Sequence, residues 1–262
     1  MSLFAPLNRP IRDWQDRRVW IVGASSGIGA ALARALAARG AWVAVSARNR
    51  AALAAVAADC GAAAVAEPLD VTAPDDFTRV RDALLARWGR LDLVVLNAGT
   101  YRPLRAWALT PQAIRETLQT NLVGAMDGAA ALAPLFSAQG SGAIALVGSV
   151  AGYGGLPKAA VYGPSKAALI NFAETLYLDL APRGVSVFLV NPGFVATPLT
   201  AQNDFHMPAL LTAEQAAEAI VAGFGRGAFE IHFPKRFTGV LKLLSLLPRR
   251  LYFPLIRKVT GS

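Results

Sequence analysis

The fold is decided by one stretch near the N-terminus, VWIVGASSGIG at residues 19–29. Its four apolar residues predict a buried strand, and a helical pattern of small and apolar residues follows at 30–38. Between them stand Gly23, Gly27 and Gly29, which permit a tight turn and a close approach of backbone to a phosphate. The following helix offers free N–H groups to an anion. The stretch predicts a strand, a phosphate-binding turn and a helix, although the spacing is not GxGxxG and a purely structural turn is the alternative.

The rest of the chain repeats the alternation of short apolar runs with helical patterns. Expected strands lie at 19–22, 42–46, 63–66, 93–97, 143–148, 185–190 and 229–232. Expected helices lie at 28–38, 50–59, 74–88, 111–135, 159–181 and 213–224. Such alternation is typical of strand–helix units that wind a parallel sheet. We therefore expect an α/β fold, a single doubly wound Rossmann-type parallel sheet with helices on both faces.

Length and charge predict one domain with a distinct C-terminal extension. The 262 residues fit one large domain, and no linker rich in Ser, Gly or Pro divides them. Residues 1–234 hold 19 Lys and Arg against 17 Asp and Glu, whereas residues 235–262 hold seven basic residues and no acidic one. We therefore divide the chain into a domain at 1–234 and a basic extension at 235–262.

The few cysteine and histidine residues limit which disulfides and metal sites the chain can form. Cys60 is the only cysteine, so an intrachain disulfide and a cysteine-based zinc cluster are excluded. His206 and His232 stand without an acidic cluster, so no metal site is expected. The first ten residues lack the pattern of an export signal, and no uncharged stretch is suited to span a membrane. These features predict a cytoplasmic protein.

A second motif, VYGPSK at 161–166, lies thirteen residues after Ser149. Tyr162 and Lys166 are four residues apart, which on a helix places phenol and ammonium on one face, where the cation can favour ionisation of the phenol. An unperturbed tyrosine has a pKa of about 10, and lowering it to near neutrality requires about 4 kcal/mol. Such a pair alone is usually two residues on a helix face, but with the glycine turn it indicates an enzyme. Pro164 is tolerated only in a first helical turn, so Tyr162 is expected close to the helix start.

Together these motifs resemble those of a classical short-chain dehydrogenase/reductase, over about residues 18–232. The glycine motif of that family, TGxxxGxG, is met at 22–29 except that Val22 replaces the usual threonine. The other matching positions, in chain order, are Asn97-Ala98-Gly99, Asn121, Ser149, Tyr162, Lys166, Pro192-Gly193 and Thr197. The resemblance implies hydride transfer between a nicotinamide cofactor and a carbonyl or alcohol, and makes 1–234 the cofactor-binding and catalytic domain.

The resemblance also assigns roles to four residues. Tyr162 is the general acid in reduction and the general base in oxidation, and Ser149 hydrogen-bonds the substrate oxygen. Lys166 holds the nicotinamide ribose and lowers the tyrosine pKa. Asn121 anchors a water in a proton relay, a role compatible with capping or bending its helix. Because hydride delivery builds negative charge on the carbonyl oxygen, preorganised donors and a proton source are what the step requires.

Cofactor choice is expected at the end of the second strand. An NAD-selective enzyme carries an acidic residue there, and an NADP enzyme carries a cation for the 2'-phosphate. Ala47 and Arg48 occupy the place, which favours NADP(H) over NAD(H), unless Arg48 is a solvated loop residue. Asp70 resembles the adenine contact of the family, or caps a helix. The expected cofactor-binding residues are Gly23, Ser25, Ser26, Gly27, Ile28, Gly29, Arg48, Asp70, Val71, Asn97, Ala98, Gly99, Tyr162, Lys166, Pro192, Gly193 and Thr197.

Apolar side chains are expected to surround the substrate. They come from the loop at 194–211 and from neighbouring loops: Phe194, Leu199, Phe205, Met207, Leu210, Tyr101, Trp107, Tyr153 and Leu156. We therefore expect a hydrophobic ketone or secondary alcohol as substrate and a homodimer or homotetramer as the assembly. The alternative is a catalytically silent NADP-binding protein whose C-terminal extension recruits a membrane or partner.

The extension at 237–258 is amphipathic. Val240, Leu244 and Leu247 share one face, and Lys242 and Ser245 lie on the other. Pro248 and Pro254 interrupt the pattern, which predicts two short helices. Such a segment can lie on an anionic membrane surface, which would place the protein at the inner face of the membrane, or it can pack on the body or a partner subunit. A continuous leucine face without a recognition motif argues against nucleic acid.

Overall fold

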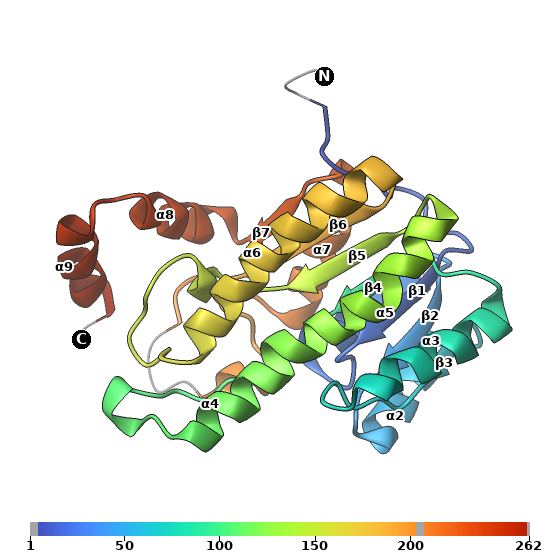
Figure 1. Cartoon of the computed structure of the whole chain (residues 1–262), viewed down its shortest axis with the longest axis horizontal. Coiled ribbons are helices and arrows are strands. Elements are labelled where there is room, and N and C mark those ends of the chain that lie inside the picture. Colours follow the sequence, from blue (N-terminus) through green and yellow to red (C-terminus); the bar gives the residue numbers. More distant parts are fainter. Residues whose placement is uncertain (1–4, 203–206, 261–262) are drawn as a thin grey trace.

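A parallel sheet forms the centre of the computed structural model, which describes residues 5–202 and 207–260 (Figure 1). Within these residues seven strands run in the order β3-β2-β1-β4-β5-β6-β7, and each neighbouring pair is parallel. The strands are β1 (Arg18–Val22), β2 (Trp42–Ser46), β3 (Ala64–Ala66), β4 (Leu93–Leu96), β5 (Ala143–Val147), β6 (Ser186–Pro192) and β7 (Glu230–Phe233). The expected Rossmann-type sheet is confirmed. Phe205 and His206 lie outside the described residues.

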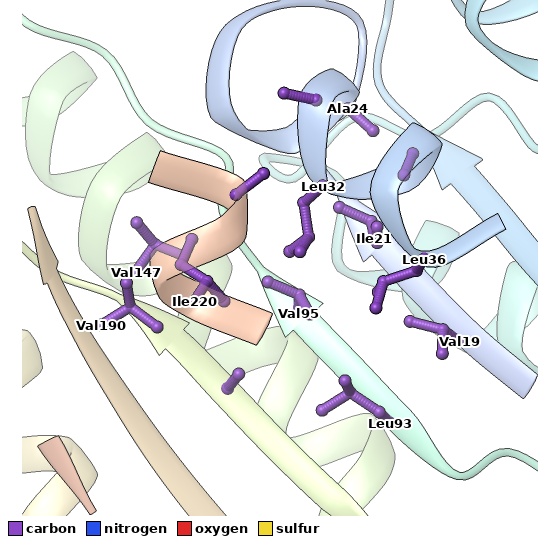
Figure 2. Packing of buried hydrophobic residues seen from close by; sticks show 14 of the residues in the cluster. Val19, Ile21, Ala24, Leu32, Leu36, Leu93, Val95, Val147, Val190 and Ile220 are labelled. Carbon is purple, nitrogen blue, oxygen red and sulfur yellow. The ribbon is translucent and has the colours of Figure 1, made fainter. Parts of the chain in front are cut away.

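Helices cover both faces of the sheet because strand side chains alternate between two cores. Val19 and Ile21 of β1 enter the core shared with α1 (Gly27–Ala37), α2 (Arg50–Cys60) and α7 (Ala213–Arg226), part of which Figure 2 shows. Trp20 and Val22 enter the core shared with α3 (Pro74–Trp88), α5 (Gly124–Gln139) and α6 (Tyr162–Leu180). The helix α6 begins at Tyr162, as Pro164 predicts.

The helix expected at 111–135 is confirmed and extends to Gln139, but it contains a π turn that the sequence interpretation did not predict. The helix α4 (Pro111–Leu118), capped by Thr110, passes into a π-helical turn η2 (Gln119–Val123) before α5 begins. A π turn inserts one extra residue per turn, so it rotates the side chains that follow. Here it carries Asn121, which is buried and hydrogen-bonded to neighbouring elements.

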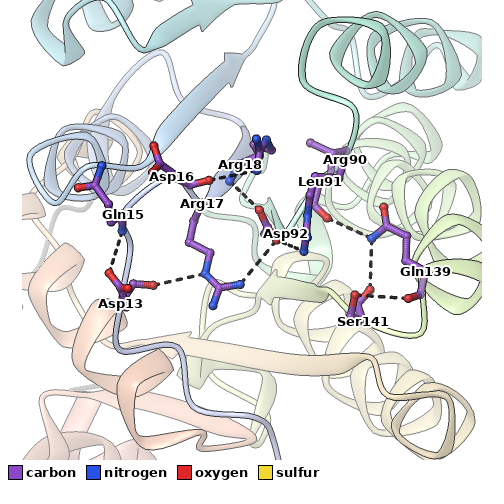
Figure 3. A network of polar contacts seen from close by, with 10 residues as sticks. All are labelled: Asp13, Gln15, Asp16, Arg17, Arg18, Arg90, Leu91, Asp92, Gln139 and Ser141. Atoms are coloured by element: carbon purple, nitrogen blue, oxygen red, sulfur yellow. Dashed lines mark hydrogen bonds and ion pairs between the residues drawn. The ribbon is translucent and has the colours of Figure 1, made fainter.

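A network of hydrogen bonds and ion pairs connects the amino ends of β1 and β4 (Figure 3). Asp92, just before β4, is 8% exposed and accepts a 2.9 Å hydrogen bond from the backbone N–H of Arg18, the first residue of β1. The guanidinium groups of Arg17 and Arg90 pair with the same carboxylate. The network therefore holds β1 and β4 in register at the end of the sheet opposite their carboxyl ends.

The C-terminal extension forms two helices, α8 (Lys235–Ser245) and α9 (Arg249–Thr260), as expected. Pro254 lies inside α9 and does not end a helix, which corrects that part of the expectation. Arg250 and Pro254 are both exposed, so water can bond the carbonyl that Pro254 leaves without an N–H partner. Among the described residues, no helix has the length and apolar character to cross a membrane.

Candidate active site

A cleft of about 690 Å³ opens at the carboxyl ends of the strands. It lies where the strand order reverses, between β1 and β4, which is where open parallel sheets bind ligands. Most of the expected residues line it: Gly23, Ser25, Ser26, Gly27, Ile28, Arg48, Asp70, Val71, Asn97, Ala98, Gly99, Ser149, Tyr162, Lys166, Pro192, Gly193 and Thr197. The fold therefore brings residues from six loops to one site.

The glycine turn forms the floor of the cleft. Gly23 and Gly27 have φ angles of +88° and +56°, and a Cβ on Gly23 would lie 2.5 Å from the backbone nitrogen of Ala98. Gly29 serves packing, since a Cβ there would lie 2.3 Å from the carbonyl oxygen of Gly23. It is absent from the described cleft lining, and its assignment as a cofactor contact stays a prediction.

The N-terminus of α1 has the properties of an anion site. The helix begins at Gly27, and Ser26 at the cap position makes no side-chain hydrogen bond to the helix. By contrast, α2, α4 and α7 each have a side-chain cap. The first N–H groups of α1 therefore remain available to a phosphate in the cleft, as a dinucleotide requires.

At the end of β2 the cleft is lined by Ala47, Arg48 and Asn49. Arg48 is exposed, and Asn49 accepts a 3.0 Å hydrogen bond from the backbone N–H of Ala52, so it caps α2. Asp70 does not cap α3, whose cap position is Ala73. Its carboxylate accepts hydrogen bonds from the backbone N–H and the hydroxyl of Thr72, so it shapes the turn beside the cleft.

Tyr162 and Ser149 come together at the carboxyl end of β5. Both line the cleft, and the Ser149 hydroxyl also accepts a 3.1 Å hydrogen bond from the backbone N–H of Ala151. The pKa of Tyr162 is raised to about 12: burial raises it most, Ser149 lowers it, and Tyr101, whose ring centroid lies 4.9 Å away, also raises it. The phenol is therefore protonated at neutral pH.

Lys166 is buried beside Tyr162, and the expectation that it lowers the tyrosine pKa stays a prediction. It is 4% exposed, and burial lowers its pKa to about 8. Its ammonium donates a 2.8 Å hydrogen bond to the carbonyl of Val147 and lies 5.8 Å from the centre of the Tyr162 ring. The charge is thus directed at the backbone rather than at the phenol oxygen.

Asn121 lies behind the site. Its side-chain oxygen accepts a 2.6 Å hydrogen bond from the backbone N–H of Thr100, and its amide donates to the Thr100 carbonyl and the Ser165 hydroxyl. It thus ties the loop after β4 to α6, while its neighbour Thr120 lines the cleft. This anchoring is what the structure shows, and the water relay stays a prediction.

Two further lining residues, Ala47 and Leu199, were named from the sequence at the end of the second strand and in the substrate loop. The lining residues that were not identified are Val22, Asn49, Leu69, Thr72, Thr120, Val147, Gly148, Val195, Pro198, Thr200 and Gln202. Most of them are adjacent in the sequence to a residue that was identified, and this adjacency is the signal that could have found them. Tyr153, expected near the substrate, instead donates its hydroxyl hydrogen to the carboxylate of Glu230.

Comparisons with known proteins agree with this geometry. Residues 17–207 match the family described as short chain dehydrogenase. An uncharacterized oxidoreductase of Myxococcus xanthus is 38% identical over 247 residues, which are 93% of this chain and 97% of the relative. The chain therefore belongs to the short-chain dehydrogenase family, and it is an oxidoreductase of that family.

Two solved structures show the same architecture. A 3-ketoacyl-(acyl-carrier-protein) reductase from Brucella melitensis complexed with NADH has a TM-score of 0.78 and 27% identity, with 85% of this chain and 99% of that chain covered. A short-chain dehydrogenase from Sphingobium yanoikuyae in complex with NADPH has a TM-score of 0.77 and 29% identity, with 89% and 97% covered.

Proposed function

We propose that the chain is an NADP(H)-dependent oxidoreductase that interconverts a hydrophobic ketone and a secondary alcohol, with Tyr162 as the acid–base group. The observation that carries the proposal is that Ser149 and Tyr162 line the same cleft as the uncapped N-terminus of α1. One end of the cleft thus suits phosphate, and the other holds two hydroxyl groups for a substrate oxygen.

The chemistry follows from what these two hydroxyl groups can do. A nicotinamide bound in the cleft supplies or accepts the hydride. Ser149 and Tyr162 donate hydrogen bonds to the substrate oxygen, which stabilises the negative charge that develops there. Because the Tyr162 pKa is raised to about 12, the phenol holds its proton at neutral pH and is suited to donate it. This favours carbonyl reduction over alcohol oxidation.

Arg48 supports the assignment of NADP(H). It lines the end of the cleft reached by the carboxyl end of β2, and residues 46–50 contain no acidic side chain to accept from a ribose hydroxyl. An exposed guanidinium suits a 2'-phosphate, which it can bind through two parallel hydrogen bonds. The related structures carry NADH in one case and NADPH in the other, so the support comes from Arg48 itself.

The test is Tyr162→Phe, measured by NADPH oxidation against a panel of ketones that includes long-chain ones. We expect loss of turnover by at least about a hundredfold, with NADPH binding retained, because one hydroxyl is removed from a cleft lined by many residues. Tyr177→Phe is the matched control, since the Tyr177 hydroxyl bonds only the backbone of Leu7 among the described residues. Unchanged turnover in a folded Tyr162→Phe variant would refute the mechanism.

The same panel of ketones distinguishes the proposed enzyme from the alternative, a catalytically silent NADP-binding protein. A catalytically silent protein would bind NADPH but show no substrate-dependent oxidation in its wild-type form. The wild-type measurement therefore precedes the variant, and turnover with any ketone excludes that alternative.

A further inference from the structure

The helix α8 turns polar side chains toward the body of the protein, whereas an ordinary surface helix turns its apolar side chains inward. Thr238 of α8 is fully buried and hydrogen-bonded to His232, and Lys242 pairs with Glu230. Two of its apolar side chains face outward, since Val240 is 58% and Leu243 69% exposed, while Phe237, Leu241 and Leu244 are half-buried. A helix that packs for stability alone buries its apolar stripe, so the two exposed apolar side chains of α8 require another partner.

The helix α9 also exposes apolar side chains. That helix buries only Tyr252 and Ile256 among its described side chains, and the Tyr252 hydroxyl donates a 3.0 Å hydrogen bond to the carbonyl of Gly155. Around the outside of both helices lie the exposed apolar residues Val240, Leu243, Leu246, Leu251, Phe253 and Leu255, which we call the tail face. The attachment to the body is therefore already made by other residues.

The charge of this segment selects the partner. Residues 235–262 carry seven basic residues and no acidic one, and six of the seven are exposed. In the described part of the chain, only Lys242 of these seven forms an ion pair. A second copy docked tail to tail would bring like charges together without acidic complements. An anionic lipid surface offers both an apolar layer and negative charge.

We propose that the tail face docks on an anionic lipid surface, independently of the reaction proposed above. The docked face would lie close to the catalytic cleft, because the extension contacts two segments beside it. Tyr252 bonds Gly155, in the segment that follows Ser149, and Phe237 packs on Phe194 with ring centroids 5.6 Å apart. Figure 1 shows α8 and α9 standing away from the sheet on one side of the molecule.

The experiment is flotation of the full chain with vesicles of phosphatidylglycerol and phosphatidylcholine, compared with vesicles of phosphatidylcholine alone. Wild-type protein is expected to float with the anionic vesicles and much less with the neutral ones. Added salt should weaken binding without abolishing it, because salt screens exposed charges over about 10 Å at 0.1 M but leaves apolar burial intact.

Matched variants test the two contributions separately. Leu246→Ser is expected to lower partitioning roughly three- to tenfold, whereas Leu178→Ser, at an equally exposed leucine on α6, leaves it unchanged. The pair Arg250→Gln and Arg257→Gln is expected to lower it roughly tenfold or more, and the control pair Arg87→Gln and Arg226→Gln by much less. The side chains at all six positions are exposed, so the fold tolerates each change.

Two results would overturn the proposal. One is wild-type protein that stays unbound with anionic vesicles. The other is an oligomer in sedimentation velocity that Leu246→Ser dissociates and Leu178→Ser does not, because the tail face would then be an interface between copies of the chain. Ketone reduction measured on the same samples reports separately on the proposed function.

Discussion

Replacement of Lys166 by methionine is expected to stabilise the fold while it abolishes turnover. Lys166 is 4% exposed, and burial lowers its pKa from 10.5 to about 8. A folded-state pKa that far below the unfolded value means that burying the charged lysine at pH 7 costs about 3 kcal/mol. Methionine has a similar unbranched shape without the charge, so this cost disappears in the variant.

One contribution opposes the gain. The ammonium donates a 2.8 Å hydrogen bond to the Val147 carbonyl, and removing that donor costs about 1 kcal/mol. The free energy of unfolding is therefore expected to rise by about 2 kcal/mol at pH 7. Turnover is expected to be lost because the family resemblance places Lys166 at the nicotinamide ribose, so the lysine would trade stability for activity.

The pH dependence gives the sharper test. Between about pH 8 and pH 10.5 the native Lys166 releases its proton while the unfolded one keeps it, so the unfolded state binds more protons. Wild-type stability therefore rises with pH in this window through this group. The advantage of Lys166→Met is largest below pH 8 and narrows as the pH rises.

The assay is urea unfolding of wild type and variant from about pH 7 to about pH 9.5, a range that stays below the raised pKa of Tyr162. The control is Lys235→Met, which changes an exposed lysine at the start of α8. A variant less stable than wild type at pH 7, or a difference that does not vary with pH, would show that the buried ammonium carries no such cost.

Two further substitutions test the cofactor and the C-terminal attachment. Arg48→Ala is expected to weaken NADPH binding more than NADH binding, by about 1.5 to 3 kcal/mol, measured by fluorescence titration; equal losses would show that Arg48 does not recognise the phosphate. Glu230→Gln is expected to lower the free energy of unfolding by about 1 to 3 kcal/mol at pH 7, because the carboxylate accepts from Tyr153, Asn191 and Lys242. Burial raises the pKa of Glu230, but these hydrogen bonds outweigh it and lower the pKa below 4.5, so the advantage of wild type holds above pH 4.5 and vanishes as pH falls through the lowered value. Equal acid unfolding curves would contradict this.

The sheet and the cleft could be predicted from the sequence because each depends on local signals. Buried parallel strands are short apolar runs, and the parallel order follows from the helices between them. Glycine at 23 and 27 is required by positive φ angles and close backbone contacts, which are properties of the turn itself. Pro164 likewise places Tyr162 at a helix start without reference to the rest of the molecule.

Other features depend on contacts between distant segments and escaped prediction. The π turn at Asn121 forms where its amide reaches Thr100 and Ser165, and Ser165 is 44 residues away. The pKa of Tyr162 depends on how closely the site is packed, which a four-residue spacing to Lys166 does not reveal. The expected homodimer or homotetramer stays a prediction, because contacts between copies of the chain are also contacts between distant segments.

Which face of α8 is buried could not be predicted from the hydrophobic pattern of the sequence. The period of the leucines predicts an amphipathic helix, but a period does not say which face turns inward. That choice is made by β7, whose Ile231 and Phe233 are buried in the core while Glu230 and His232 point to its other side. Since these two polar groups bond Lys242 and Thr238, the polar stripe of α8 turns inward. Two residues on the edge strand thus help to determine that Val240 and Leu243 are exposed rather than buried in the core.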